Sequence, residues 1–329
     1  LKQFILIFFF SLSFSCYAQN FHLIINGSNP AETQVIDSTN YSKTHKNTKS
    51  LLDEIKITSQ KLSRKGYIDN QATTTTKTND STYNTLIILK KQITSIHLNI
   101  KSINSIFNLE TKKNDNIIIP YNEIESYLSK TTVDAEKQGY ALSKLKLENI
   151  RRKNQIIYSD LKFESEKKRV INSIIIKYQN TTKTDYFPKG HLKQLNKKYT
   201  HKTFNQETLK ELYTDINNYE FLNQTKYPEI LFTNDSTKIY SYIEKREANT
   251  FDGYLGFSNE ENKKIRLNGY LDITLLNTLH SGEQFSLYWK SDGNQQQSFN
   301  TKIEIPYIFQ SPLGIKAQLN IFKQDSTFQ

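Results

Sequence analysis

The sequence predicts an α+β protein in which three tandem modules precede the first strands of an antiparallel transmembrane β-barrel. Three observations support this prediction. The N-terminus carries a short apolar run that is typical of exported proteins. After it, an order of strand, helix, strand and strand recurs three times. Residues 251–321 then alternate apolar and polar side chains, which is the pattern of strands with two different faces.

The N-terminal residues have the parts of a secretory signal peptide. Lys2 precedes the apolar run Phe4–Phe14, and the small residue Ala18 closes the segment. The run is too short to cross a bilayer as a helix, which takes about 20 apolar residues. We therefore expect residues 1–18 to be removed together with Cys16, the one cysteine of the sequence. Lipoprotein processing at Cys16 is the alternative, although the residues before it fit a lipobox poorly.

Composition and motifs give no sign of catalysis or of nucleic-acid binding. The net charge is +11, but the basic residues are spread along the chain and form no block longer than Lys167–Arg169. None of the six histidines is paired at a spacing typical of metal ligands. Because nucleophile elbows and phosphate-binding loops are also missing, we expect no enzyme activity, no cofactor, no metal and no nucleic-acid partner.

Residues 19–91 are predicted to form the first module. Its expected elements are the strand Phe21–Ile25, a polar loop Asn26–Lys49, a helix through Leu51 and Leu62 that ends at Gly66, and the strands Ala72–Lys77 and Tyr83–Leu89. The glycine at the helix end suits a C-cap, because it adopts the left-handed conformation freely.

Residues 92–167 and 168–247 repeat this order. In the second module we expect the strand Ile93–Ile100, the helix Tyr121–Lys137, and the strands Ala141–Asn149 and Gln155–Phe163. In the third we expect the strand Val170–Tyr178, the helices Lys189–Tyr199 and Asn205–Asn217, and the strands Glu229–Phe232 and Lys238–Ile243. Such a repeat predicts an array of small domains, each with a helix layer on one sheet.

Residues 248–329 are predicted to form the N-terminal part of the barrel. The apolar positions of the alternating segments are Leu267, Leu271, Ile273 and Leu275, then Phe285, Leu287 and Trp289, then Ile303, Ile305 and Tyr307, and finally Ile315, Leu319 and Ile321. Strands of about 10 residues with one apolar face are typical of membrane barrels. A soluble β-sandwich with one wetted face would show the same alternation. Since the smallest membrane barrels need about 8 strands, we expect the barrel to be incomplete in this chain.

The order of modules and strands resembles the BamA/TamA outer-membrane assembly family, in which POTRA modules precede a β-barrel. The resemblance is carried by Lys137–Ile150, Val170–Asn180 and Ile243–Phe257. In members from Bacteroidetes-like bacteria, the last of these segments joins the final POTRA module to the first barrel strand. The resemblance implies three POTRA-like β-α-α-β-β modules in the periplasm and a barrel in the cell outer membrane.

The resemblance also implies a function in outer-membrane protein assembly or translocation. Unfolded β-rich clients would be received by the modules and inserted or exported through the barrel. The implied partners are unfolded outer-membrane or secreted proteins, outer-membrane lipid, and periplasmic or lipoprotein partners. An outer-membrane pore or a barrel anchor for another activity is an alternative, and a soluble periplasmic binding protein is a weaker one.

Two candidate sites follow from the resemblance. The second strand of a POTRA module lies at a sheet edge and can accept an extended client by β-augmentation. The favoured edge is the longest, and its candidate residues are Ala141, Ser143, Leu145, Leu147 and Asn149. Simple solvation of the edge, or packing on a neighbouring module, is the alternative. The second site is a weak barrel seam at Asn249, Gly253 and Gly256, because glycines weaken a strand.

Overall fold

The computed structural model describes residues 20–101, 103, 115–179, 186–259, 265–293 and 296–324. The predicted signal peptide lies outside these residues. The chain divides into two compact units. One contains residues up to 132 together with 144–164, and the other contains residues 133–143 and those from 165 onward. None of the described helices is long and apolar enough to span a membrane.

The first module is a sheet covered by two helices. Its elements are β1 (Phe21–Asn26), α2 (Pro30–Asp37), β2 (Thr44–His45), α3 (Thr48–Arg64), β3 (Gln71–Ala72), β4 (Thr76–Lys77) and β5 (Thr82–Ile88). The strand order is β2-β1-β5-β3, with β4 also paired to β5. Leu23, Ile25, Leu51, Leu62 and Ile87 are among the residues of its core.

The predicted loop Asn26–Lys49 is wrong, because α2 lies within it. Asn29 caps this helix by accepting a hydrogen bond from the Glu32 backbone N–H at 2.9 Å, and Pro30 occupies its first turn. The helix buries Ile36 alone, so its sequence shows almost no apolar periodicity. The predicted strand Ala72–Lys77 is also interrupted, since β3 and β4 are two-residue strands.

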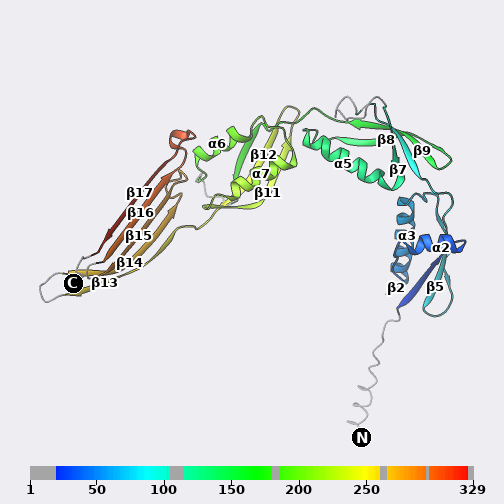
Figure 1. The fold of residues 1–329 in the computed structure, drawn as a ribbon, viewed down its shortest axis with the longest axis horizontal. Coiled ribbons are helices and arrows are strands. Elements are labelled where there is room, and N and C mark those ends of the chain that lie inside the picture. Colours follow the sequence, from blue (N-terminus) through cyan, green and yellow to red (C-terminus); the bar gives the residue numbers. More distant parts are fainter. Residues whose placement is uncertain are drawn as a thin grey trace, which may run out of the picture. The chain divides into compact units, whose positions relative to one another are not determined.

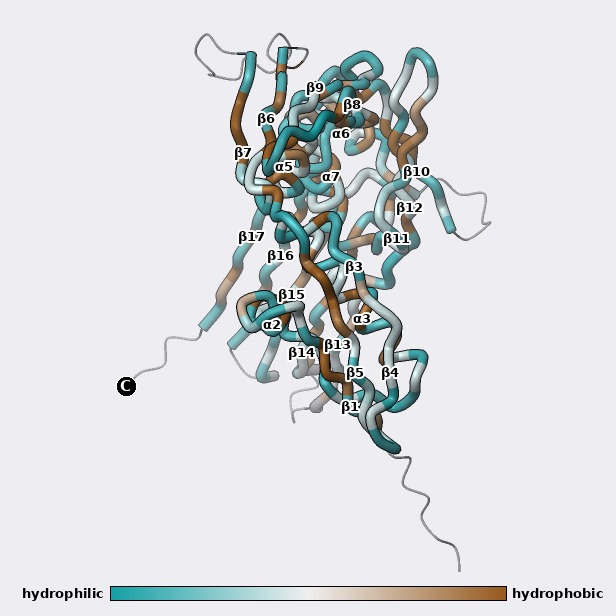
Figure 2. The backbone as a smooth tube through the Cα atoms, turned by 90° about the vertical axis from the view of Figure 1, so that its right-hand side faces the viewer, coloured by the Kyte–Doolittle hydropathy of each residue, from teal (hydrophilic) through white to brown (hydrophobic). Residues whose placement is uncertain are grey.

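The second module contains one strand more than the sequence predicted. Its elements are β6 (Ser95–Asn99), β7 (Asn116–Pro120), the 3₁₀ turn η1 (Tyr121–Glu123), α5 (Ile124–Lys137), β8 (Lys144–Lys153) and β9 (Ile156–Glu164), with the strand order β7-β6-β9-β8. The additional strand is β7, which pairs antiparallel with β6 and is coloured brown for its isoleucines in Figure 2. Ile96, Leu98 and Leu161 belong to the core.

The third module follows the predicted order. Its elements are β10 (Ser173–Tyr178), α6 (Lys189–Tyr199), α7 (Gln206–Asn217), β11 (Leu222–Phe232) and β12 (Thr237–Lys245), with the strand order β10-β12-β11. Asn205 caps α7 by accepting a hydrogen bond from the Thr208 backbone N–H at 2.7 Å. In all three modules the strand after the helices lies at a sheet edge, as the resemblance implied.

The C-terminal part is an antiparallel meander of five strands. The strands are β13 (Thr250–Asn259), β14 (Ile265–Leu276), β15 (Gln284–Asp292), β16 (Gln297–Ile305) and β17 (Ile315–Lys323), and each pairs with its neighbour in the chain. They lie side by side in Figure 1. The register places Leu271 opposite Trp289 and Ile273 opposite Leu287, so apolar residues share one face. The predicted alternation is confirmed.

Candidate functional site

The predicted client-binding edge is β8, but only part of the candidate set lies on this strand. Ala141 and Ser143 precede it in a turn, where the Ser143 backbone N–H donates to the Tyr140 carbonyl at 3.2 Å. Ala141 packs against the core of the third module. The sequence placed the start of the strand three residues too early, because the turn residues happen to continue its alternation.

Leu145 and Leu147 point from β8 toward the core of the second module. The alternate residues Lys144, Lys146 and Glu148 lie on the opposite, charged face. Lys146 is paired with Glu164 at 2.6 Å across the strands, and Glu148 is paired with Lys162 at 2.9 Å. Hydrogen bonding to Lys146 lowers the pKa of the exposed Glu164 carboxyl. Any client on this edge would therefore contact backbone groups beside a charged face.

Asn149 is the point at which the regular edge ends. Its backbone is left-handed, with φ +54°, and the pairing of β8 with β9 shifts between Glu148 and Arg151. The Asn149 side-chain amide donates to Asp160 Oδ2 at 2.7 Å. This β-bulge bends the strand, and the uninterrupted edge runs from Lys144 to Glu148.

The edges of the other two modules are more interrupted. In the third module, β11 contains Pro228, which lacks an N–H, and its pairing shifts between Gln224 and Lys226 and again between Lys226 and Glu229. In the first module, β3 and β4 offer two residues each. The longest regular edge among the described strands that follow the helices is therefore that of β8.

The residues of the predicted seam lie at the free edge of the five-stranded sheet. Asn249 precedes β13 and accepts a hydrogen bond from the Leu276 backbone N–H at 2.8 Å. A Cβ on Gly253 would lie 2.5 Å from the Tyr270 carbonyl oxygen, and one on Gly256 would lie 2.3 Å from Asn268 Oδ1. Both glycines thus permit close approach to β14, with which β13 pairs without interruption.

A further cluster, which the sequence did not indicate, joins the third module to the turns of the sheet. The Asn277 side-chain amide donates to the Tyr186 carbonyl at 2.9 Å, and Gln194 donates to the Gln310 carbonyl at 2.9 Å. The turn between β14 and β15 is closed by Glu283, whose carboxylate accepts from the backbone N–H groups of Leu279 and Ser281. The two turns at this end of the sheet therefore contact α6 and the segment that precedes it.

His191 lies at the centre of this cluster. Its ring is in edge-on contact with Tyr219 and Tyr307, with centroid distances of 4.8 Å to each, and it also contacts Phe187 and Phe221. Burial lowers the pKa of His191 from 6.5 to about 4, and burial likewise raises the pKa of Tyr219. The histidine is therefore neutral at pH 7. No sequence pattern indicates this cluster, because its members are far apart along the chain.

No group of three or more His, Cys, Asp or Glu residues in the described part of the chain could hold a metal ion. The arrangement consists of exposed strand edges, an open sheet and a packed junction.

Comparisons with known proteins found likeness in structure alone. No protein-family model matches the chain, and no curated protein matches it in sequence. BamA from Haemophilus ducreyi lacking POTRA domains 1–3 is similar over 71% of this chain and 43% of that chain, with 12% identity and a TM-score of 0.46. POTRA domains 3–5 of Haemophilus influenzae BamA are similar over 70% of this chain and 96% of that one, with 13% identity and a TM-score of 0.41.

CdiB from Acinetobacter baumannii is similar over 70% of this chain and 44% of that chain, with 12% identity and a TM-score of 0.37. The chain thus spans less than half the length of this CdiB structure and of the H. ducreyi BamA structure. The matched structures include BamA and POTRA domains.

Proposed function

We propose that the chain is part of an outer-membrane protein assembly or translocation factor. Its modules would receive unfolded β-rich clients in the periplasm, and its five-stranded sheet would belong to a membrane barrel that inserts or exports them. The observation that carries this proposal is the uncovered apolar face of the sheet. Pairing places apolar residues from all five strands on that face: Phe251, Leu255 and Phe257, then Leu267, Leu271, Ile273 and Leu275, then Phe285, Leu287 and Trp289, then Phe299, Ile303 and Ile305, then Ile315, Leu319 and Ile321.

Several of these side chains remain exposed. The exposed fractions are 72% for Phe251, 71% for Phe257 and 58% for Ile315. Within the described residues, none of the three core clusters contains a buried residue of these strands. A soluble protein rarely exposes an apolar surface of this extent, whereas a barrel strand turns such a face toward lipid. A β-sandwich would require a second apolar layer, which the described residues do not supply.

The opposite face of the sheet is polar and suits a barrel interior. It carries Asp252, Tyr270, Lys290 and Lys302 in successive strands. The turns after β14 and β16 lie at the end that contacts the third module. That end would face the periplasm, and the strands would cross the membrane away from the module.

Clients would first pair with the regular edge of β8, Lys144–Glu148. An edge strand presents N–H and C=O groups that bind an extended chain whatever its side chains. The same edge carries Lys144 and Lys146, and charges of this kind discourage edge-to-edge pairing between folded copies of a protein. The edge would therefore accept an unfolded client strand, whereas two folded copies of the protein would not pair through it.

Site-specific photo-crosslinking tests this proposal. A photoreactive amino acid at Lys146 should crosslink newly made outer-membrane β-barrel proteins in cells. The same group at Lys56, on the exposed face of α3, provides the matched control and should not. Depletion of the protein should also lower the amounts of other outer-membrane β-barrel proteins. If those amounts are unchanged while solute uptake falls, the protein is a pore and the proposal is wrong.

A further inference from the structure

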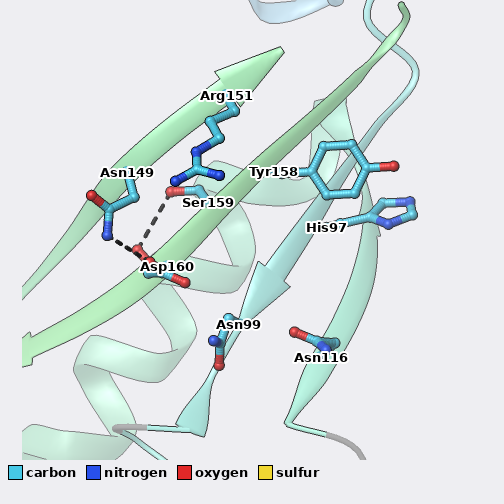
Figure 3. A pocket seen from close by; sticks show the side chains of 8 residues that line it. All are labelled: His97, Asn99, Asn116, Asn149, Arg151, Tyr158, Ser159 and Asp160. Carbon is cyan, nitrogen blue, oxygen red and sulfur yellow. Dashed lines mark hydrogen bonds between the residues drawn. The ribbon is translucent and has the colours of Figure 1, made fainter. Parts of the chain in front are cut away.

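The second module carries a cavity on the face of its sheet that points away from the core. The cavity has a volume of about 420 Å³ and is open to solvent (Figure 3). Side chains from all four strands line it, namely His97, Asn99, Asn116, Asn149, Arg151, Tyr158, Ser159 and Asp160. Its size falls within the range of small-molecule sites, about 300–1,000 Å³. It lies apart from the hydrophobic interior, where Ile96 and Leu98 are buried.

The bulge of β8 shapes one wall of the cavity. Because the pairing shifts between Glu148 and Arg151, Arg151 pairs with Tyr158 and lies on its face of the sheet. Asn149 is meanwhile held against Asp160 by the hydrogen bond from its amide. Figure 3 shows the Arg151 side chain beside Ser159 and above Asp160. Bulges commonly redirect side chains next to functional sites, and here the bulge brings a guanidinium to the cavity.

Two rings form the second wall. His97 of β6 and Tyr158 of β9 are register partners, and their ring centroids are 4.9 Å apart at an interplanar angle of 59°. Tyr158 is 39% exposed and is one of the residues that line the cavity. An exposed aromatic ring attracts the C–H face of a ligand, since the negative face of the π-system meets the positive hydrogens. These two rings therefore offer a platform for a flat, partly apolar ring.

Polar groups complete the lining. Asn99 and Asn116 are register partners on β6 and β7. In the described part of the chain, the Asn116 carboxamide and the Arg151 guanidinium make no hydrogen bond or ion pair. The carboxamides can donate as well as accept, the guanidinium donates in a planar fork, and the Asp160 carboxylate accepts. One cationic and one anionic group leave the cavity close to neutral.

We propose that this cavity binds a neutral saccharide unit, with the sugar ring packed on Tyr158 and its hydroxyls bound by Arg151, Asn116 and Asp160. Vicinal hydroxyls both donate and accept, which matches neighbouring carboxamide, carboxylate and guanidinium groups. A free phosphate or carboxylate would meet the Asp160 carboxylate as well as Arg151, and the net attraction would be small. An apolar ligand would leave the carboxamides unpaired at a cost in affinity.

The test uses the full chain in a zwitterionic, sugar-free detergent, with saturation-transfer NMR as the readout of binding. The probes are N,N′-diacetylchitobiose, cellobiose and maltose, with inorganic phosphate and acetate as charged competitors. At least one disaccharide should bind with a Kd on the order of 1 mM. Its signal should be retained in the presence of equal concentrations of phosphate or acetate.

Matched variants locate the binding. Tyr158→Ala and Arg151→Gln should each weaken binding by at least about tenfold, whereas Tyr158→Phe, which keeps the ring, should bind within about threefold of the original chain. Lys153→Gln, on the same strand but not among the residues that line the cavity, should bind normally. Arg151→Gln alters an exposed side chain, so it remains informative if Tyr158→Ala fails to fold. Failure of all three disaccharides to bind, equal binding by Arg151→Gln, or displacement by phosphate would each overturn the proposal.

Discussion

The His191 ring lies directly against Gly282, so closely that a Cβ on Gly282 would be 2.0 Å from His191 Cε1. Gly282 also has φ +75°, a backbone conformation that other residues adopt at a cost. Its backbone N–H donates to the Asn277 side chain at 2.9 Å, and Asn277 in turn donates to Tyr186. This one turn thus fits between the histidine ring and the segment before α6. The contact sets how the third module meets the end of the sheet.

The first prediction is that Gly282→Ala loosens this junction. The added methyl group must displace the buried ring of His191, and the backbone conformation is strained in addition. Together these effects should cost about 2–4 kcal/mol of local stability. Hydrogen exchange of the α6 amides should accelerate accordingly.

Gly293→Ala is the matched control for that prediction. Gly293 has a similar φ of +81°, but it follows β15 whereas Gly282 precedes it, and a Cβ there would meet the side chain of Asn268 at 3.0 Å. It should carry the strain of the backbone without the steric conflict at His191. Equal acceleration of α6 exchange in both variants would show that the His191 contact does not hold the junction.

The second prediction concerns pH. Burial holds the folded-state pKa of His191 at about 4, below the ordinary 6.5. The unfolded chain therefore binds more protons than the folded chain between these values, so stability is full above about pH 6.5 and falls as pH decreases toward 4. The loss should reach about 2–3 kcal/mol by pH 4.5. Urea unfolding of the third module at pH 7.5 and 4.5 measures it.

His191→Phe isolates this effect, because phenylalanine fills a similar volume and does not titrate. The difference in unfolding free energy between the two pH values should shrink by most of the predicted amount in this variant. The residue faces the uncharged rings of Phe187, Tyr219, Phe221 and Tyr307, so no counter-ion among them compensates its protonation. An unchanged pH dependence would assign the acid sensitivity to other groups.

Such contacts mark the limit of what the sequence could predict. The period-2 alternation at Leu271, Ile273 and Leu275 is local, so the sheet and its faces could be predicted. The short helix α2 could not, since it buries Ile36 alone. The strand β7 is defined by pairing with β6 rather than by its own pattern. The burial of His191 could not be predicted either, because Gly282 and Tyr307 lie near it only in the folded chain.

The third prediction concerns the bulge of β8. Asn149 has φ +54°, which asparagine and glycine adopt more readily than β-branched residues. Asn149→Val should destabilise the second module by about 1–3 kcal/mol, because it forces the strained conformation and loses the bond to Asp160. Asn149→Gly loses that hydrogen bond but adopts the left-handed conformation readily, so its loss of stability should be smaller. Denaturant unfolding compares the two, and a valine variant as stable as the glycine variant would contradict a bulge at this position.

The last prediction tests which environment the five-stranded sheet occupies. Leu287 and Ser286 are neighbours on β15 whose side chains lie on opposite faces, since Leu287 is paired with Ile273 and Ser286 with Thr274. In a membrane barrel, Leu287→Lys places a charge in lipid and should cost about 2–4 kcal/mol near the bilayer centre, whereas Ser286→Lys faces the interior and should be tolerated. The amount of the protein that resists urea extraction from outer membranes provides the measurement. Leu287→Lys should reduce that amount several-fold and Ser286→Lys should not.

In a water-exposed sheet without a covering layer, both lysines would be solvated and both variants would behave alike. Equal tolerance would therefore exclude lipid contact on this face.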